Sequence, residues 1–267
     1  MVIHQRAFLC SYLWVMSEDE IAGLLNTKYE QFHTSAFIDD DPVCIPHLFS
    51  MSQDIEIAGF FAATFAWGQR VTIINKCREL MELMDMSPYD FVINHTTGDL
   101  ERFEHFKHRT FQFTDLKYFL KRLQEHYTAN DSLESLFAKG TTMKERLTEF
   151  EKRFTASEGF EKRTGKHVAT PARKSTCKRL NMYLRWMVRK DAIGVDFGIW
   201  NSISMAELQC PLDVHVERVG RALGLIKRKQ RDWETVEELT NSLRKFDVND
   251  PVKYDYALFG LGIMDKF

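Results

Sequence analysis

Lys178 and Asp213 are the two residues of this sequence whose types and settings best suggest chemistry. Lys178 follows a basic stretch and begins an amphipathic segment, and Asp213 follows Pro211 and Leu212 directly before another patterned segment. An amine can attack the anomeric carbon of a sugar, and a carboxylate can stabilise the cation that develops there. The pair is therefore suited to nucleophilic attack at a sugar carbon, if the fold brings the two groups together.

Asp213 also has a simpler interpretation, as the N-cap of the segment that follows it. Pro211 favours an extended approach, and aspartate is one of the preferred N-cap residues. Capping does not exclude chemistry, because the amides at a helix N-terminus favour the anionic carboxylate. His215 faces another side of this helix start, where it is either structural or a contact to the substrate.

Lys178 competes with Lys174 for the role of nucleophile. Apolar residues stand 2, 4, 5, 6, 9 and 10 positions after Lys178, whereas the positions after Lys174 include Thr176 and Arg179. This pattern favours Lys178. Crowding by Arg173, Lys174 and Arg179 would favour a neutral amine part of the time. The alternative is that Lys178 only contacts phosphate or solvent.

The charge of the chain is strongly asymmetric around this lysine. Residues 161–190 contain ten Lys or Arg and one acid, so that segment carries +9, while the rest of the chain carries −11. Focused positive charge is what a protein needs to meet a phosphate backbone. A solvated helix face is the alternative explanation.

Composition and periodicity predict an all-α protein with an ample core. The 267 residues include 21 Phe but only 13 Gly and 6 Pro, and no segment alternates long enough to propose a sheet. Ser17 is a predicted N-cap, Gly68 ends a nearly apolar buried helix, and residues 140–170 and 191–208 are predicted to be irregular, the second with one helical turn. The predicted helices are 18–32, 54–67, 71–85, 99–106, 115–127, 133–138, 178–190, 214–225, 233–246 and 254–264.

Several classes of protein are disfavoured by what the sequence lacks. No apolar run approaches the roughly 18 residues of a membrane span. The five cysteines are scattered without a Cys-x-x-Cys pair, which gives no zinc ribbon, disulfide framework or four-cysteine iron–sulfur loop. We therefore expect no metal or other cofactor and a cytoplasmic location. Residues 1–16 are interpreted as a frayed or over-extended N-terminus rather than a signal peptide, with Met16 as a possible true start.

Three stretches of the chain resemble DUF2400, a bacterial family of unknown function. They are Phe61–Gln69, Lys178–Arg189 and Tyr254–Gly262. More broadly, the lysine after a turn and the later Pro-x-Asp-x-His segment resemble the helix-hairpin-helix, Gly/Pro-Asp (HhH-GPD) superfamily of DNA glycosylases. The archaeal 8-oxoguanine glycosylases are the most similar branch, since they share an altered hairpin and a long gap between lysine and aspartate.

This resemblance implies a specific architecture and activity. Residues 17–45 and 210–267 would form one helical subdomain and residues 46–209 a central one carrying the hairpin, with a cleft between them. The implied function is a monomeric DNA glycosylase, with possible AP-lyase activity, on a flipped and damaged base of double-stranded DNA, an oxidised purine being favoured. Lys178 would form a Schiff base with the sugar, and Asp213 would stabilise the sugar cation.

The resemblance also implies contacts to DNA. Relatives carry a glutamine that fills the gap left by a flipped base, and Gln69, with Arg70 beside it, stands near that position; a helix end at Gly68 is the simpler explanation. In relatives glycine amides of the hairpin approach a phosphate, whereas the matching stretch here, with Arg173, Lys174 and Ser175 before Lys178 and Arg179, has no glycine.

Two rival interpretations remain, and the glycine-free hairpin supports the first of them. The chain could be a nucleic-acid-binding module that retains the fold without excising bases. It could also be a small-molecule enzyme of unrelated all-α fold, which would require Lys178 and Asp213 to lie far apart.

Overall fold

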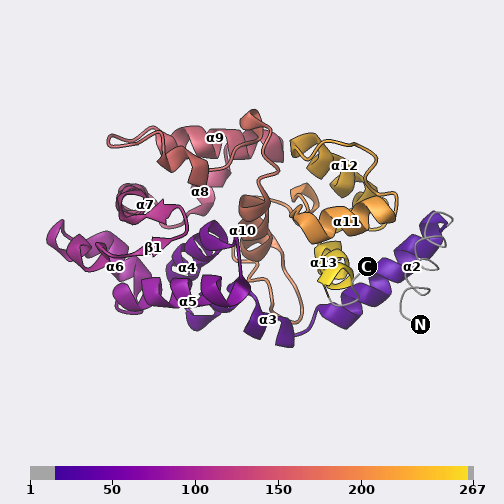
Figure 1. Ribbon diagram of the computed structural model, residues 1–267, viewed down its shortest axis with the longest axis horizontal. Helices are drawn as coiled ribbons and strands as arrows, with labels where there is room; N and C mark the ends of the chain where they lie inside the picture. The colour runs from indigo at the N-terminus through magenta and orange to yellow at the C-terminus, as the bar shows by residue number, and fades with distance from the viewer. Residues whose placement is uncertain (1–15, 264–267) are drawn as a thin grey trace.

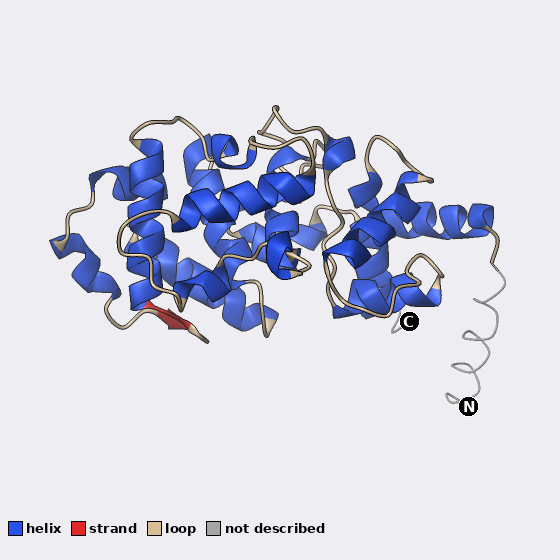
Figure 2. Cartoon of the chain, turned by 90° about the horizontal axis from the view of Figure 1, so that it is seen from above, coloured by secondary structure: helices blue, strands red, loops and turns tan. Residues whose placement is uncertain are grey.

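The computed structural model describes residues 16–263 as an almost entirely helical protein (Figures 1 and 2). The predicted all-α class is confirmed. Within the described range the sheet is a two-stranded antiparallel ladder, β1 (Lys107–His108) with β2 (Phe111–Gln112). Our interpretation of the N-terminal segment concerns residues 1–16, of which residues 1–15 lie outside the described residues.

Helix α4 (Ser52–Phe65) is the centre of the larger apolar cluster. Every residue from Asp54 to Phe65 is buried, as expected for a nearly apolar helix. Helix α4 packs against α10 (Lys178–Val188), and Gly59 allows this approach because an added Cβ would lie 3.1 Å from Met187 Cε. The buried helix thus supports the helix that carries the proposed nucleophile.

The remaining helices of this part of the chain surround α4 and α10. Helix α4 also contacts α5 (Arg70–Leu83), α6 (Pro88–Asn94) and the short 3₁₀ turns η2 (Pro42–Cys44) and η3 (Pro46–Leu48). The other elements are α3 (Ala36–Asp40), η4 (Gly98–Phe103), α7 (Phe113–Tyr127), α8 (Glu134–Phe137), α9 (Met143–Thr155), η5 (Thr164–His167), η6 (Pro171–Arg173) and η7 (Met205–Glu207).

Helix α9 corrects one sequence prediction. We expected residues 140–170 to be irregular, but α9 begins with a capping box between Thr142 and Glu145. Its buried residues include Leu147, Phe150 and Phe154. In addition, the predicted helix 99–106 is the 3₁₀ segment η4 followed by β1, and α3 and α6 were not predicted.

The two ends of the described chain meet in a second apolar cluster. Helix α13 (Tyr254–Ile263) packs against both α2 (Glu18–Phe32) and α11 (Val214–Ala222), as Figure 1 shows. Leu25, Val216, Leu239 of α12 (Trp233–Arg244) and Leu258 are among its buried members. Ser17 caps α2, as the sequence predicted.

The two apolar clusters do not divide the chain at one point. The larger cluster includes Val43, Trp233, Val252 of η8 (Pro251–Lys253) and Tyr256, although most of the buried apolar residues within 210–261 belong to the smaller one. The boundaries of the two proposed subdomains therefore stay a prediction.

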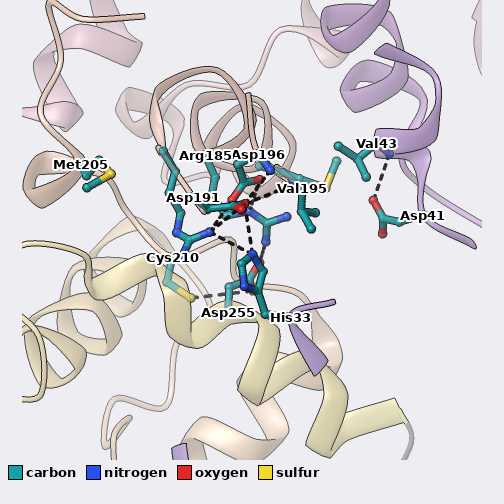
Figure 3. A network of polar contacts seen from close by, with 12 residues as sticks. His33, Asp41, Val43, Arg185, Asp191, Val195, Asp196, Met205, Cys210 and Asp255 are labelled. Carbon is teal, nitrogen blue, oxygen red and sulfur yellow. Dashed lines mark hydrogen bonds and ion pairs between the residues drawn. The ribbon is translucent and has the colours of Figure 1, made fainter. Parts of the chain in front are cut away.

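A buried ionic network spans the space between the clusters (Figure 3). Arg189, the C-cap residue of α10, is 2% exposed and donates to Asp196 at 3.0 Å and to Asp250 at 2.9 Å. Arg185, one turn earlier and 3% exposed, pairs with Asp196 and with Asp255 of α13. Because each buried charge has an opposite partner, the network holds α10 against the C-terminal segments.

Asp191 organises the irregular segment 191–208 that follows α10. Its carboxylate accepts backbone N–H groups of Ile193, Gly194, Val195 and Asp196 and faces His33 Nε2 at 3.1 Å. Burial alone would raise the pKa of Asp191. The hydrogen bonds from His33 and the backbone amides lower this pKa by a larger amount, so the net pKa lies below its usual range. As predicted, this segment contains a single helical turn, η7.

Candidate active site

Lys178 and Asp213 line the same cavity, which has a volume of about 690 Å³. Its walls come from α10, the segment that enters α11, α13, the turn between α4 and α5, and the residues around η2. Lys174 does not line this cavity. The fold thus brings the two predicted residues to one space, with Lys178 as the lysine that faces it.

Lys178 is the first residue of α10, and its face of the helix forms one wall of the cavity. Met182 and Arg185, four and seven positions further on, also line the cavity, as expected for residues on one helical face. The amine Nζ of Lys178 lies 3.6 Å from Met182 Sδ. Its side chain therefore lies along helix α10 toward Met182, on the wall of the cavity.

Asp213 is the N-cap of α11, as the sequence predicted. Its backbone is extended, with φ −103° and ψ −175°, and Oδ1 accepts the amides of His215 at 2.8 Å and Val216 at 2.9 Å. Pro211 and Leu212 are buried before it. The cap fixes the direction of the carboxylate.

Of three residues predicted to contact DNA, Arg70 and His215 line the cavity and Gln69 does not. Arg70 lines the cavity, and its guanidinium lies 5.5 Å above the ring of Phe259 on α13. His215 also lines the cavity, with its ring edge-on to Phe259 at 6.3 Å. Gln69 is exposed at the N-cap of α5 and does not line the cavity.

The hairpin before Lys178 keeps a left-handed backbone without glycine. Lys174 has φ +59° and Cys177 has φ +50°, a conformation that costs most residues roughly 1–2 kcal/mol. Ser175 Oγ accepts the amide of Cys177 at 3.1 Å and supports the turn. The element before the turn is the 3₁₀ segment η6, not an α-helix.

The basic segment is only partly a surface feature. Arg173 pairs with Glu151 at 2.7 Å, and Arg179 donates to the carbonyl of Thr64 at 2.5 Å and lies over Trp67. Burial lowers the pKa of the Arg179 guanidinium. Lys174 is exposed and makes no ion pair with residues 16–263.

Asp255 is a cavity residue that our sequence analysis missed. It is 7% exposed, lines the cavity with Lys178 and Asp213, and pairs with Arg185. Burial raises the pKa of Asp255 to about 6; Arg185 and Lys178 oppose this rise, whereas the charge of Asp213 adds to it. The sequence signal for Asp255 was an acid inside an otherwise apolar helix, because such a carboxylate is buried and needs a partner.

Asp41, the N-cap of η2, is a second buried acid that the sequence analysis did not select for the site. It lines the cavity, and its side chain accepts the amide of Val43. Burial raises the pKa of Asp41, while the Val43 amide and the charges of Arg185, Arg70 and Lys178 oppose that rise. The cavity thus combines several cations with three carboxylates.

The described residues show neither a metal site nor a membrane span. Across residues 16–263, no group of three or more His, Cys, Asp or Glu could hold a metal ion. None of the helices in that range combines the length and apolar character needed to cross a bilayer.

Comparison with known proteins gives one match. No curated protein and no solved structure matched the chain. A family model described as "Protein of unknown function (DUF2400)" matches residues 41–264, which include the cavity-lining residues of α10, α11 and α13. The chain belongs to the DUF2400 family.

Proposed function

We propose that this protein is a DNA glycosylase with AP-lyase activity that acts on a flipped, damaged base, with an oxidised purine favoured. It would use an HhH-GPD-like arrangement with residues 17–45 and 210–267 facing residues 46–209 across the cavity. We expect it to act as a monomer on double-stranded DNA in the cytoplasm. The proposal needs a nucleophile, a cation stabiliser and room for a nucleobase.

The observation that carries this proposal is the common cavity of Lys178 and Asp213. They come from separate elements, Lys178 from the start of α10 and Asp213 from the N-cap of α11. A volume of about 690 Å³ lies within the range of roughly 300–1,000 Å³ typical of small-ligand sites. Trp67 and Phe259, both partly exposed, supply aromatic surface on which a flipped base could stack.

The mechanism follows from the placement of the two groups. The amine of Lys178 attacks the anomeric carbon, and the bond to the base breaks with its electron pair leaving on the base. Asp213, held by two backbone amides, stabilises the positive charge that develops on the sugar. Ring opening then gives an imine, from which β-elimination cleaves the strand. Exposed Lys174 would contact the phosphate backbone.

Borohydride trapping tests this proposal, because only an amine nucleophile passes through a reducible imine. The purified protein is incubated with duplexes carrying oxidised, alkylated, deaminated or abasic sites, with borohydride present. We expect a covalent complex with the wild type and with the matched control Lys174→Ala, and none with Lys178→Ala. Asp213→Asn should slow base excision by about 10²-fold or more.

The rival function is a nucleic-acid-binding module without base excision, which the glycine-free hairpin favours. It would bind duplex DNA with a salt-dependent affinity yet never form a trapped complex on any lesion. A protein that binds no DNA at all would contradict both functions and favour a small-molecule substrate.

A further inference from the structure

Asp255 is a second carboxylate of the cavity, and it has no role in the glycosylase mechanism proposed above. It lies in the first turn of α13, lines the cavity with Lys178 and Asp213, and is 7% exposed. A carboxylate this well buried is expensive unless it is paired, and Arg185 provides the pair. The question is why a charged group is retained beside the proposed nucleophile.

The charged groups around Asp255 come from three segments of the chain. Helix α10 contributes Arg185 and Lys178, the entry to α11 contributes Asp213, and the irregular segment contributes Asp196. The thiol of Cys210 donates to Asp255 Oδ1 at 3.9 Å.

Neighbouring helices also bring titratable groups close to α13, but these groups contact residues of α13 other than Asp255. His33, which follows α2, packs on Tyr256 with ring centroids 4.6 Å apart. From α11, His215 lies against Gly262, and Arg218 donates to the carbonyl of Gly262. Among the described residues, Arg185 is thus the cation paired directly with Asp255.

The two carboxylates near Lys178 have different environments. Asp213 accepts two backbone amides at the N-terminus of α11, which fix the direction of its carboxylate. Asp255 is enclosed, and burial with the charge of Asp213 raises its pKa from 3.8 to about 6. When neighbouring acids differ in this way, one suits charge stabilisation and the other suits proton transfer.

We propose that Asp255 is the proton acceptor for Lys178, directly or through one water molecule. This inference rests on the proposed glycosylase function. One proton passes from the Lys178 ammonium to the Asp255 carboxylate, and the freed electron pair forms the bond to the anomeric carbon. The bond to the base breaks with its pair on the base, which then takes the proton from Asp255. The carboxylate is thereby restored, and no other reactant is needed.

The elevated proton affinity of Asp255 suits this role. An acceptor of pKa about 6 is a stronger base than an ordinary aspartate, whose pKa is about two units lower. This difference favours proton transfer from Lys178 to Asp255 by about 100-fold. Above pH 6 the acid remains mostly ionised and able to accept. Below pH 6 it is already protonated, so the reaction should slow.

The test is the pH dependence of single-turnover base excision by the wild type, Asp255→Asn and Asp255→Glu. In the wild type the rate should rise to a plateau above pH 6 and change by less than about twofold between pH 6.5 and 8. In Asp255→Asn the neutral amine must form without the acceptor, so the rate should be lower and rise about tenfold per pH unit across that range. Asp255→Glu should restore a plateau.

Asp250→Asn is the matched control, because Asp250 pairs with Arg189 in the same network but does not line the cavity. It should keep the wild-type pH profile even if its melting temperature falls. A wild type that keeps rising from pH 6.5 to 8, or an Asp255→Asn variant with an unchanged plateau, overturns the role of Asp255. If Asp255→Asn does not fold, the wild-type profile still decides. A wild type that excises no base refutes the proposed function instead.

Discussion

The two roles of Asp213, helix cap and cation stabiliser, can be separated by comparison with Asp232. Both aspartates are N-caps: Asp213 accepts the amides of His215 and Val216, and Asp232 accepts the amide of Thr235 at 3.1 Å. Losing an N-cap costs about 1 kcal/mol, which corresponds to a fall of about 2–4 °C in melting temperature. Asp213→Ala and Asp232→Ala should therefore lose similar stability, whereas Asp213→Asn should lose less because asparagine also caps helices.

Their effects on activity should differ widely. Asp232 does not line the cavity, so Asp232→Ala should leave the rate of base excision within about twofold of the wild type. Asp213→Asn should lower it by about 10²-fold or more despite its nearly intact stability. Thermal denaturation followed by circular dichroism and single-turnover excision measure the two quantities. If Asp213→Asn excises normally, or if Asp232→Ala loses as much activity, the charge of Asp213 has no specific role.

Three further predictions concern the fold and the DNA-binding surface. Burial alone would raise the pKa of Asp115. The hydrogen bonds that its carboxylate accepts lower this pKa by a larger amount, so the net pKa lies below the usual value. Its stabilising contribution is complete above the unfolded pKa of about 3.9 and disappears as the pH falls through the lower folded pKa. Asp115→Asn should therefore cost about 1.5–3 kcal/mol of unfolding free energy at pH 7, and its difference from the wild type should shrink in acid. In denaturant titrations Gly260→Ala should lose about 1–3 kcal/mol of unfolding free energy, because its Cβ would overlap the ring of Phe32. Gly23→Ala should gain about 0.5–1 kcal/mol of unfolding free energy, because nothing lies within 4 Å of its Cβ. Lys174→Ala should reduce the slope of log K against log salt for duplex DNA by about one unit in fluorescence anisotropy, and an unchanged slope would remove Lys174 from the binding surface.

Local signals predicted the elements that carry strong periodicity or a cap. The predicted bounds of α2 match because Ser17 and Glu20 form a capping box, and α4 was found because its buried residues are almost all apolar. Helix α9 was missed because its many charged residues obscured the apolar positions that its capping box introduces. Strands of two residues, such as β1, are too short to show alternation.

The site was predictable only where a local sequence pattern existed. Lys178 and Asp213 each begin a patterned helix, so their settings could be recognised. Asp255 depends on Arg185, which lies far away in the chain, and no local pattern reveals that contact. The same contacts explain why the +9 segment is not one basic face, since Arg185 and Arg189 are buried in the ionic network.

The most direct test of the central claim is to identify the residue that becomes covalently attached to DNA. After borohydride trapping on a lesion duplex, the complex is digested with nuclease and protease, and the modified peptide is sequenced by mass spectrometry. The account predicts a sugar remnant on the amine of Lys178. A remnant on Lys174 or on any other lysine, or a wild-type protein that never becomes attached, would contradict it.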